Sequence, residues 1–295
     1  MSTSSPFSLV LPVRLTKKRN EREYLTQLLL PSLERHLDPQ ARLIVVAPDE
    51  QLDTVRQLFS RLSRHTVRCL ADSAVVPDVP DDVKGWRRQQ MIKLMVAQQV
   101  DTPHYITLDA DVFLLRPVTP QTLWRDNRLV INLAPASRQA EWWRASADLL
   151  GVAPPPDDAT TISVTPAILV AEEVRHLIDT VRQRHGGRPF EAVLAESRFT
   201  EYTLYWCHLL SRGLHDTLYV TEGPGLFSAL WQFDMDGDLQ AQFLAYVRAN
   251  PSAFALVQSS NKLKPAQFLP PGWDIRHWQP PQASVQPPQA SAPLA

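Results

Sequence analysis

The sequence predicts an α/β protein with a mostly parallel central sheet flanked by helices. Apolar runs of strand length alternate with longer stretches of helical periodicity up to Asp111. That order of strand, helix and strand predicts parallel strands joined by right-handed crossovers. The composition, 44% hydrophobic and 21% charged over 295 residues, is typical of a globular protein long enough to bury a core.

The first part of the chain has the clearest pattern. The expected strands are 7–13, 43–47, 66–70 and 104–108, and the expected helices are 21–37, 49–62 and 86–99. The run 43–47 is rich in β-branched residues and ends at Pro48, as a strand buried on both faces does. Asp49 is expected to cap the helix that follows.

The second part is less regular. Strands are expected at 129–133, 161–165 and 218–221, and helices at 171–185, 200–211 and 238–248. Gly186 is expected to end the first of these helices. Residues 279–295 are almost entirely Pro, Gln, Ala and Ser, a composition that predicts a disordered tail.

Charge and composition exclude several classes of protein. The formal net charge of −1 provides no field that would recruit nucleic acid. Two isolated cysteines form neither a disulfide framework nor a zinc site and suit a reducing compartment. We therefore expect a cytoplasmic protein without a signal peptide or a transmembrane segment, with peripheral membrane contact left open. The sequence has no G-x-G-x-x-G or Walker loop, which argues against dinucleotide oxidoreductases and P-loop NTPases.

Two carboxylates directly follow the strand expected at 104–108. The segment Tyr105–Phe113 reads YITLDADVF, so Asp109 and Asp111 are separated only by Ala110. Parallel sheets bind ligands beyond the carboxyl ends of their strands. Carboxylate oxygens suit Mn²⁺ or Mg²⁺, ions that complete their shells with substrate phosphates. The alternative is a solvated turn in which Asp109 caps the following segment.

A polar stripe marks the helix expected at 86–99. The segment Trp86–Leu94 reads WRRQQMIKL. Trp86, Gln89, Gln90 and Lys93 fall on one side of this helix, because residues three, four and seven apart are neighbours. Amide and ammonium groups suit a nucleotide or its phosphates. A solvated helix face with a packed tryptophan is the alternative.

These two segments together resemble the donor half of bacterial GT-A glycosyltransferase-like proteins, a superfamily that includes a poorly characterised group. Leu9–Arg14, which reads LVLPVR, is similar to the first strand and loop that contact the nucleotide in that superfamily. The resemblance covers most of residues 6–120. Beyond them it thins to Phe199–Tyr205, which reads FTEYTLY and is similar to an acceptor-side segment.

The resemblance implies a GT-A (Rossmann-like) fold and a nucleoside diphosphate sugar as donor, with a UDP-sugar favoured. It implies that Asp109 and Asp111 bind Mn²⁺ or Mg²⁺ against the diphosphate. The other expected donor contacts are Pro12, Val13, Arg14, Trp86, Gln89, Gln90, Lys93 and Ala110. A single domain over 1–278 is then expected, with a nucleotide-sugar half at about 6–120. The half at about 121–278 would bind a glycan or lipid-linked acceptor.

Glu201 is the candidate catalytic residue. It lies near an expected helix start, where the helix dipole favours a carboxylate for purely structural reasons. The functional alternative makes it the base that takes the proton of the acceptor hydroxyl, or the group that orients the acceptor.

Other segments of the sequence also carry candidate metal ligands. Asp234–Asp238 carries alternating carboxylates but lacks the Gly and Glu spacing of an EF-hand, so a turn with Asp238 capping a helix is expected. It is nonetheless the main rival metal site. A third ligand beside Asp109 and Asp111 is expected from His277 or from the polar segment Gln258–Ser260.

Two rival functions remain. A phosphatase of the haloacid-dehalogenase type also places Asp-x-Asp after a strand, but normally after the first strand and with a hydroxyl residue near the second Asp. Here the motif comes late in the chain and continues with Val112 and Phe113. The other rival is a protein of the same fold that binds a nucleotide-sugar or a glycan without turnover.

Overall fold

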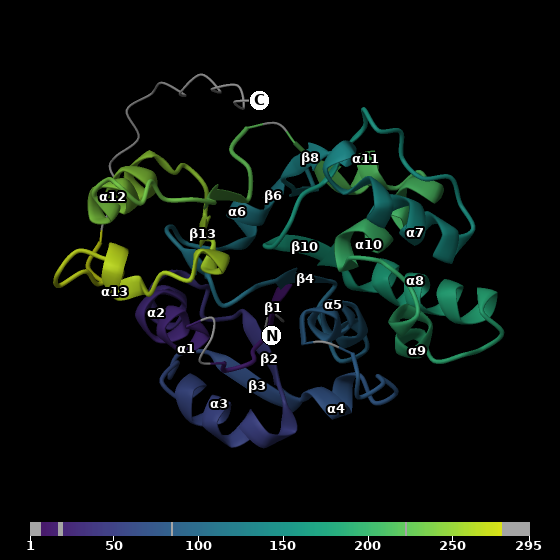
Figure 1. Cartoon of the computed structure of the whole chain (residues 1–295), viewed down its shortest axis with the longest axis horizontal. Coiled ribbons are helices and arrows are strands. Elements are labelled where there is room, and N and C mark those ends of the chain that lie inside the picture. Colours follow the sequence, from purple (N-terminus) through teal and green to yellow (C-terminus); the bar gives the residue numbers. More distant parts are fainter. Residues whose placement is uncertain (1–6, 17–19, 84, 222, 279–295) are drawn as a thin grey trace.

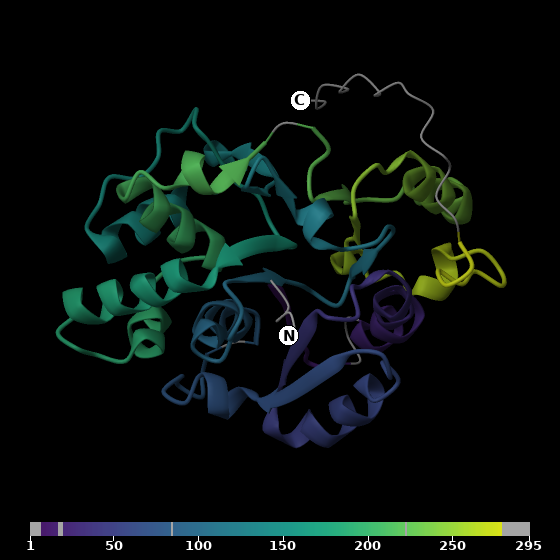
Figure 2. The same cartoon turned by 180° about the vertical axis from the view of Figure 1, so that it is seen from behind.

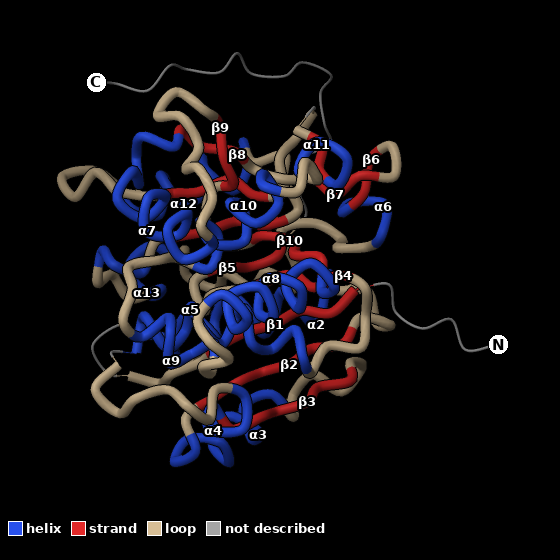
Figure 3. Tube along the Cα trace, turned by 90° about the vertical axis from the view of Figure 1, so that its right-hand side faces the viewer, coloured by secondary structure: helices blue, strands red, loops and turns tan. Residues whose placement is uncertain are grey.

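A five-stranded sheet forms the centre of the protein, in the order β10, β4, β1, β2, β3 (Figure 3). The computed structural model describes residues 7–16, 20–83, 85–221 and 223–278. The strands of this sheet are β1 (Phe7–Pro12), β2 (Arg42–Ala47), β3 (Thr66–Ala71), β4 (His104–Thr107) and β10 (Ala167–Val170). All pairs are parallel except β10 with β4. The predicted α/β architecture with a mostly parallel sheet is therefore confirmed.

Helices cover both faces of this sheet. Figure 1 shows α2 and α5 on opposite sides of β1. The first helical elements are α1 (Glu21–Tyr24), α2 (Leu30–His36), α3 (Leu52–Phe59), α4 (Asp72–Val75) and α5 (Gly85–Met95). A π-helical turn at Leu25–Leu29 joins α1 to α2. It ends two residues before Pro31, whose ring would crowd the carbonyl of Gln27 in a regular α-helix.

The middle of the chain forms a helical group beside β10, on the side of the sheet where α5 lies (Figure 1). Its helices are α7 (Ala140–Leu150), α8 (Ala171–Arg184), α9 (Phe190–Ala195), α10 (Glu201–Ser211) and α11 (His215–Leu218). Its short strands are β6 (Trp124–Arg125), β7 (Arg128–Val130), β8 (Leu133–Pro135), β9 (Thr160–Ile162) and β11 (Tyr219–Val220). The short helix α6 (Pro120–Leu123) lies apart from this group in Figure 1.

The last part of the chain returns to the first helices. Its elements are β12 (Phe227–Leu230), α12 (Leu239–Ala249), β13 (Phe254–Val257) and α13 (Pro265–Phe268), and β13 pairs with β5 (Val112–Leu114). Their apolar side chains form a second hydrophobic cluster that includes Tyr24, Phe113 and Phe268. Figure 2 shows this yellow segment beside the purple helices. Short 3-10 turns complete the fold at Asp49–Gln51, Val96–Gln98, Ala136–Gln139 and Ser259–Asn261.

Several local expectations need correction. Asp49 does not cap the next helix, because its carboxylate accepts a 2.7 Å hydrogen bond from the Ser73 hydroxyl. The strand expected at 161–165 is the shorter β9, which ends at Ile162. The edge strand β10 that follows it was not predicted, and neither were β5, β12 and β13. The expected tail at 279–295 lies outside the described residues. Within the described ranges, no helix has the length and apolar character needed to cross a membrane.

Candidate functional site

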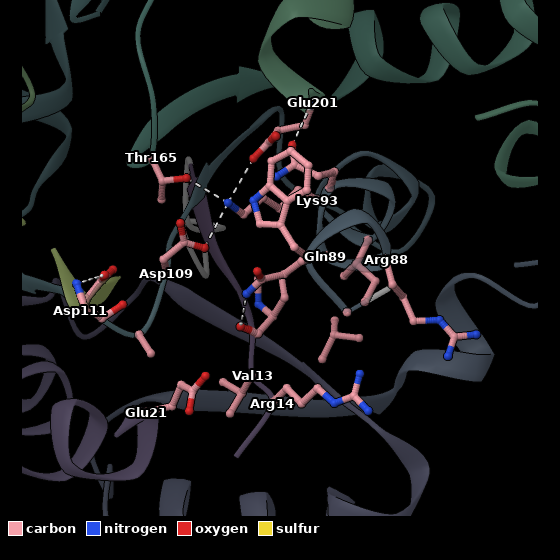
Figure 4. Close-up of a pocket in the computed structure, with 18 of the residues that line it drawn as sticks. Val13, Arg14, Glu21, Arg88, Gln89, Lys93, Asp109, Asp111, Thr165 and Glu201 are labelled. Carbon is pink, nitrogen blue, oxygen red and sulfur yellow. Dashed lines mark hydrogen bonds and ion pairs between the residues drawn. The ribbon is translucent and has the colours of Figure 1, made fainter. Parts of the chain in front are cut away.

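A cavity of about 840 Å³ opens at the carboxyl ends of the parallel strands (Figure 4). The residues that the sequence singled out for donor contacts, for the paired cation ligands and for catalysis line it: Pro12, Val13, Arg14, Trp86, Gln89, Gln90, Lys93, Asp109, Ala110, Asp111 and Glu201. The rest of the wall includes Ser163–Thr165, Trp231, Gln258 and Ser259. The cavity is therefore built from both halves of the chain.

Sheet register explains why the first loop meets the carboxylates. β1 and β4 are parallel neighbours in which Val10 lies opposite Thr107. The backbone N–H of Leu108 then donates to the carbonyl of Val10 at 2.8 Å. Because both strands end at the same edge, the loop after Pro12 and the segment from Asp109 to Asp111 lie side by side there.

Asp111 is a buried carboxylate fixed by the C-terminal part of the chain. Its Oδ2 accepts a 2.9 Å hydrogen bond from the backbone N–H of Ser259. Burial, together with the charge of Asp109, raises the pKa of Asp111 to about 6. A buried carboxylate beside a second negative charge attracts a cation, which would relieve the repulsion.

Lys93 is a fully buried ammonium surrounded by oxygen atoms (Figure 4). Its Nζ lies 2.7 Å from Thr165 Oγ1, 2.9 Å from Glu201 Oε1 and 3.0 Å from Asp109 Oδ1. Burial lowers the pKa of Lys93, but the combined attraction of Asp109 and Glu201 outweighs it and leaves the pKa well above its ordinary value. Lys93 therefore stays charged and joins the two carboxylates.

Glu201 is the first residue of α10 and is also buried. Thr200 caps this helix by accepting a 3.0 Å hydrogen bond from the N–H of Thr203, and the N–H of Glu201 donates to Gln90 Oε1 at 3.1 Å. Burial raises the pKa of the Glu201 carboxyl, and Lys93 offsets only part of the effect. The net direction is upward, which keeps Glu201 able to accept a proton.

The polar side of α5 is placed by further contacts. Gln89 Nε2 donates to the carbonyl of Pro12 at 3.3 Å, which connects the helix to the first loop. A Cβ at Gly85 would lie 2.8 Å from Arg14 Nη1, so only glycine leaves that guanidinium its present place. The alternative expectation of a solvated helix face is wrong, because Gln90 and Lys93 are buried.

The lining residues that were not predicted from the sequence include Asp72, Arg88 and Trp231. Asp72 directly follows β3 and forms an ion pair with Arg88, whose Nη1 lies 3.6 Å from Asp72 Oδ2. The rule that drew attention to Asp109, a carboxylate at the end of a strand, would also have found Asp72. Trp231 directly follows β12, a strand that was not predicted, and no motif marks it.

The rival ligands lie elsewhere. Asp234 Oδ1 accepts from the N–H of Asp236 at 3.1 Å, and Asp238 caps α12, so this segment is the expected turn. The His277 side chain is 85% exposed and lies beside Asp274, whereas Gln258 and Ser259 line the cavity. In the described part of the chain, no three His, Cys, Asp or Glu side chains gather in a metal-binding group. Asp109 and Asp111 would therefore hold a cation with backbone, amide, hydroxyl or ligand oxygens.

Fold and site together define an α/β protein with paired carboxylates at the carboxyl edge of a mostly parallel sheet. The chain belongs to the family described as a family of unknown function, DUF6492, whose family model matches residues 4–270. A search of curated proteins found no match. Among solved structures, the crystal structure of mouse xyloside xylosyltransferase 1 in its apo form is similar at 14% sequence identity and a TM-score of 0.49. The similarity covers 85% of this chain and 97% of that one.

Proposed function

We propose that this protein is a metal-dependent glycosyltransferase of the GT-A type, which moves a sugar from a nucleoside diphosphate sugar to a hydroxyl acceptor. One observation carries the proposal. The residues predicted for donor, cation and catalysis, taken from segments far apart in the sequence, line one cavity beside the Asp109 and Asp111 carboxylates. Its volume of about 840 Å³ lies within the range of small-molecule sites.

The donor set suits a hard divalent cation such as Mn²⁺ or Mg²⁺. Asp109 and Asp111 supply carboxylate oxygens, and their mutual repulsion favours a positive charge between them. When bound, the cation would neutralise the charge that develops on the diphosphate leaving group. Lys93 holds Asp109 from the protein side and limits the orientations open to that carboxylate.

The donor is proposed to lie across the strand ends, between the loop after β1 and the polar side of α5. Arg14 and Arg88 both line this part of the cavity and supply guanidinium donors. Gln89 fixes the first loop through the carbonyl of Pro12. A UDP-sugar as donor, the two-part division of the chain and a cytoplasmic location remain predictions from the sequence.

Glu201 is proposed as the base. It lines the cavity from the acceptor half, and the upward direction of its pKa suits proton uptake from an acceptor hydroxyl. Its Oε1 is held by Lys93, so the carboxylate is positioned without a contact from substrate. A protein of the same fold that binds without turnover would use the same cavity, and only an assay of turnover separates it from an enzyme.

The test is calorimetric titration of UDP and of GDP into the purified protein, once with Mn²⁺ and once with EDTA. Binding is expected only with Mn²⁺, and the Asp111→Asn variant should weaken it by about tenfold or more. Asp234→Asn is the matched control, because it alters the rival carboxylate segment and should leave binding unchanged. Binding that persists in EDTA or in Asp111→Asn would remove the cation site from the proposal. Loss of nucleotide binding in Asp234→Asn but not in Asp111→Asn would assign the metal site to the Asp234–Asp238 segment instead.

A further inference from the structure

Two tryptophans leave a large part of their surface open at the cavity. Trp86 is 41% exposed and Trp231 is 45% exposed, and both line the cavity. Trp86 is at the start of α5, and Trp231 follows β12, the parallel partner of β13. Figure 1 shows α5 and β13 on opposite sides of β1 and β4, so the two tryptophans come from elements on different sides of these central strands. Exposed aromatic surface in a cavity that also presents polar side chains marks a place for a ligand.

Contacts with neighbouring elements hold Trp86 and the segment that carries Trp231 in place. The Trp86 ring packs edge-on against Trp142 of α7, with the ring centroids 5.1 Å apart and an interplanar angle of 87°. The carbonyl of Leu230, the residue before Trp231, accepts a 3.1 Å hydrogen bond from the N–H of Gln258. The next residue, Ser259, donates to Asp111. The segment that carries Trp231 is thus linked to the proposed cation site by two hydrogen bonds, donated by the N–H groups of Gln258 and Ser259.

The most exposed large apolar side chains of the cavity wall are the two tryptophan rings and not aliphatic residues. Of the larger aliphatic residues that line the cavity, Val13, Val46, Ile92 and Leu256 are buried and Val164 is half-buried. An acyl chain needs a continuous apolar path, which these four buried side chains and one half-buried side chain do not provide. The hydroxyl and amide groups on the acceptor side come from Ser163, Thr165, Gln258 and Ser259.

Flat rings beside hydroxyl and amide groups match a pyranose, which has an apolar C–H face and a rim of hydroxyl groups. We infer that the acceptor is a saccharide whose sugar ring stacks on Trp231, with Trp86 as a second aromatic surface of the same cavity. The role of this saccharide as the acceptor rests on the proposed function. Its binding at Trp231 does not, and it can be tested without any nucleotide. It selects between the glycan and lipid-linked acceptors that the sequence left open.

The test uses saturation-transfer NMR and calorimetry with maltotriose, cellotriose, xylotriose, chitotriose and mannotriose, in the absence of nucleotide. At least one trisaccharide should bind wild-type protein, and Trp231→Ala should weaken it by about tenfold or more, because the stacking face is removed. Trp231→Phe keeps an aromatic ring and should retain most of the affinity. Met235→Ala is the matched control, since that side chain is 62% exposed, four residues away and outside the set that lines the cavity.

Several results would overturn the inference. These are no binding of any trisaccharide, equal affinity in Trp231→Ala, or equal losses in Trp231→Ala and Met235→Ala. If decyl phosphate binds in a way that depends on Trp231 and no trisaccharide binds, the inferred acceptor is a lipid and not a saccharide. Titration of UDP with Mn²⁺ into Trp231→Ala separates the two proposals. If saccharide binding depends on Trp231 but the wild-type protein binds no nucleotide, the saccharide site is supported and the proposed glycosyltransferase function is contradicted.

Discussion

Lys93 joins the proposed cation ligand Asp109 to the proposed base Glu201 through a single buried ammonium. A buried charge is tolerated only where opposite charges and hydrogen bonds surround it. The hydroxyl of Thr165 supplies the additional hydrogen bond. Lys93 is therefore a positioning residue in this proposal, because it orders two carboxylates that would contact the cation and the acceptor.

Glu201→Gln is expected to lower turnover by about a hundredfold or more, because an amide cannot take up the proton of the attacking hydroxyl. The dissociation constant of UDP with Mn²⁺ should change little. Release of UDP from a UDP-sugar, with water as acceptor, measures the rate. Glu191→Gln is the control, since Glu191 is an equally buried carboxylate on α9 that is not among the described residues lining the cavity. An unchanged rate in Glu201→Gln would exclude the base role.

At the residue level, the sequence predicted what depends on local order along the chain. Asp109 and Asp111 were found because a strand precedes them directly, and Lys93 because helical spacing places it beside Gln89 and Gln90. The contact of Asp111 with Ser259 could not be predicted, because it depends on how the C-terminal segment folds back. Trp231 was missed for the same reason.

The end of α2 carries a buried histidine that the proposed function does not use. His36 is buried, and its Nε2 has no hydrogen-bond partner. Burial lowers the pKa of His36 from an ordinary value of 6.5 to about 4, with Arg35 and Arg116 acting in the same direction. The unfolded chain therefore binds more protons than the native protein between these values, and stability is lost as the pH falls through that window.

His36→Gln is expected to reduce this loss of stability. Between pH 7.5 and pH 4.5, the free energy of unfolding of the variant should fall by about 2 to 3 kcal/mol less than that of the wild type, at most. Urea denaturation at both pH values measures the difference, and the comparison at pH 7.5 shows the cost of the substitution itself. Parallel declines of the two proteins would contradict a neutral, buried His36.

Elements with a strong internal pattern were predictable, and short ones were not. β1 and β2 are buried runs whose apolar residues alone indicate a strand. β10 and β13 have only four residues each, and their pairing partners are distant in the sequence. A run of that length is equally compatible with a buried helix end, so tertiary pairing decides its conformation.

The whole molecule is arranged around the cavity, whose wall extends from Pro12 to Ser259. Two hydrophobic clusters support it, one around the central sheet and one where the C-terminal segment packs on α1 and its π-helical turn. A ligand that contacts this wall binds the native protein and not the unfolded chain. Binding should then stabilise the fold as a whole.

UDP with Mn²⁺ at one hundred times the dissociation constant should raise the free energy of unfolding by about 2.7 kcal/mol. Chemical denaturation with and without the nucleotide measures this change. The stabilisation should disappear in EDTA and shrink in Asp111→Asn. Equal stabilisation with and without Mn²⁺ would show that the nucleotide does not depend on the cation.

The hydrogen bond between Ser259 and Asp111 joins residues that are 148 positions apart. A chain emerging from the ribosome would already contain the central strands and both carboxylates while Ser259 was still unsynthesised. Asp111 would then lack its backbone partner, and the wall that carries Trp231 and Gln258 would be missing. Contacts of such long sequence separation form late in folding. The site is thus completed only near the end of synthesis, and a chain truncated before Ser259 would keep the strands that present Asp109 and Asp111 but not the finished site.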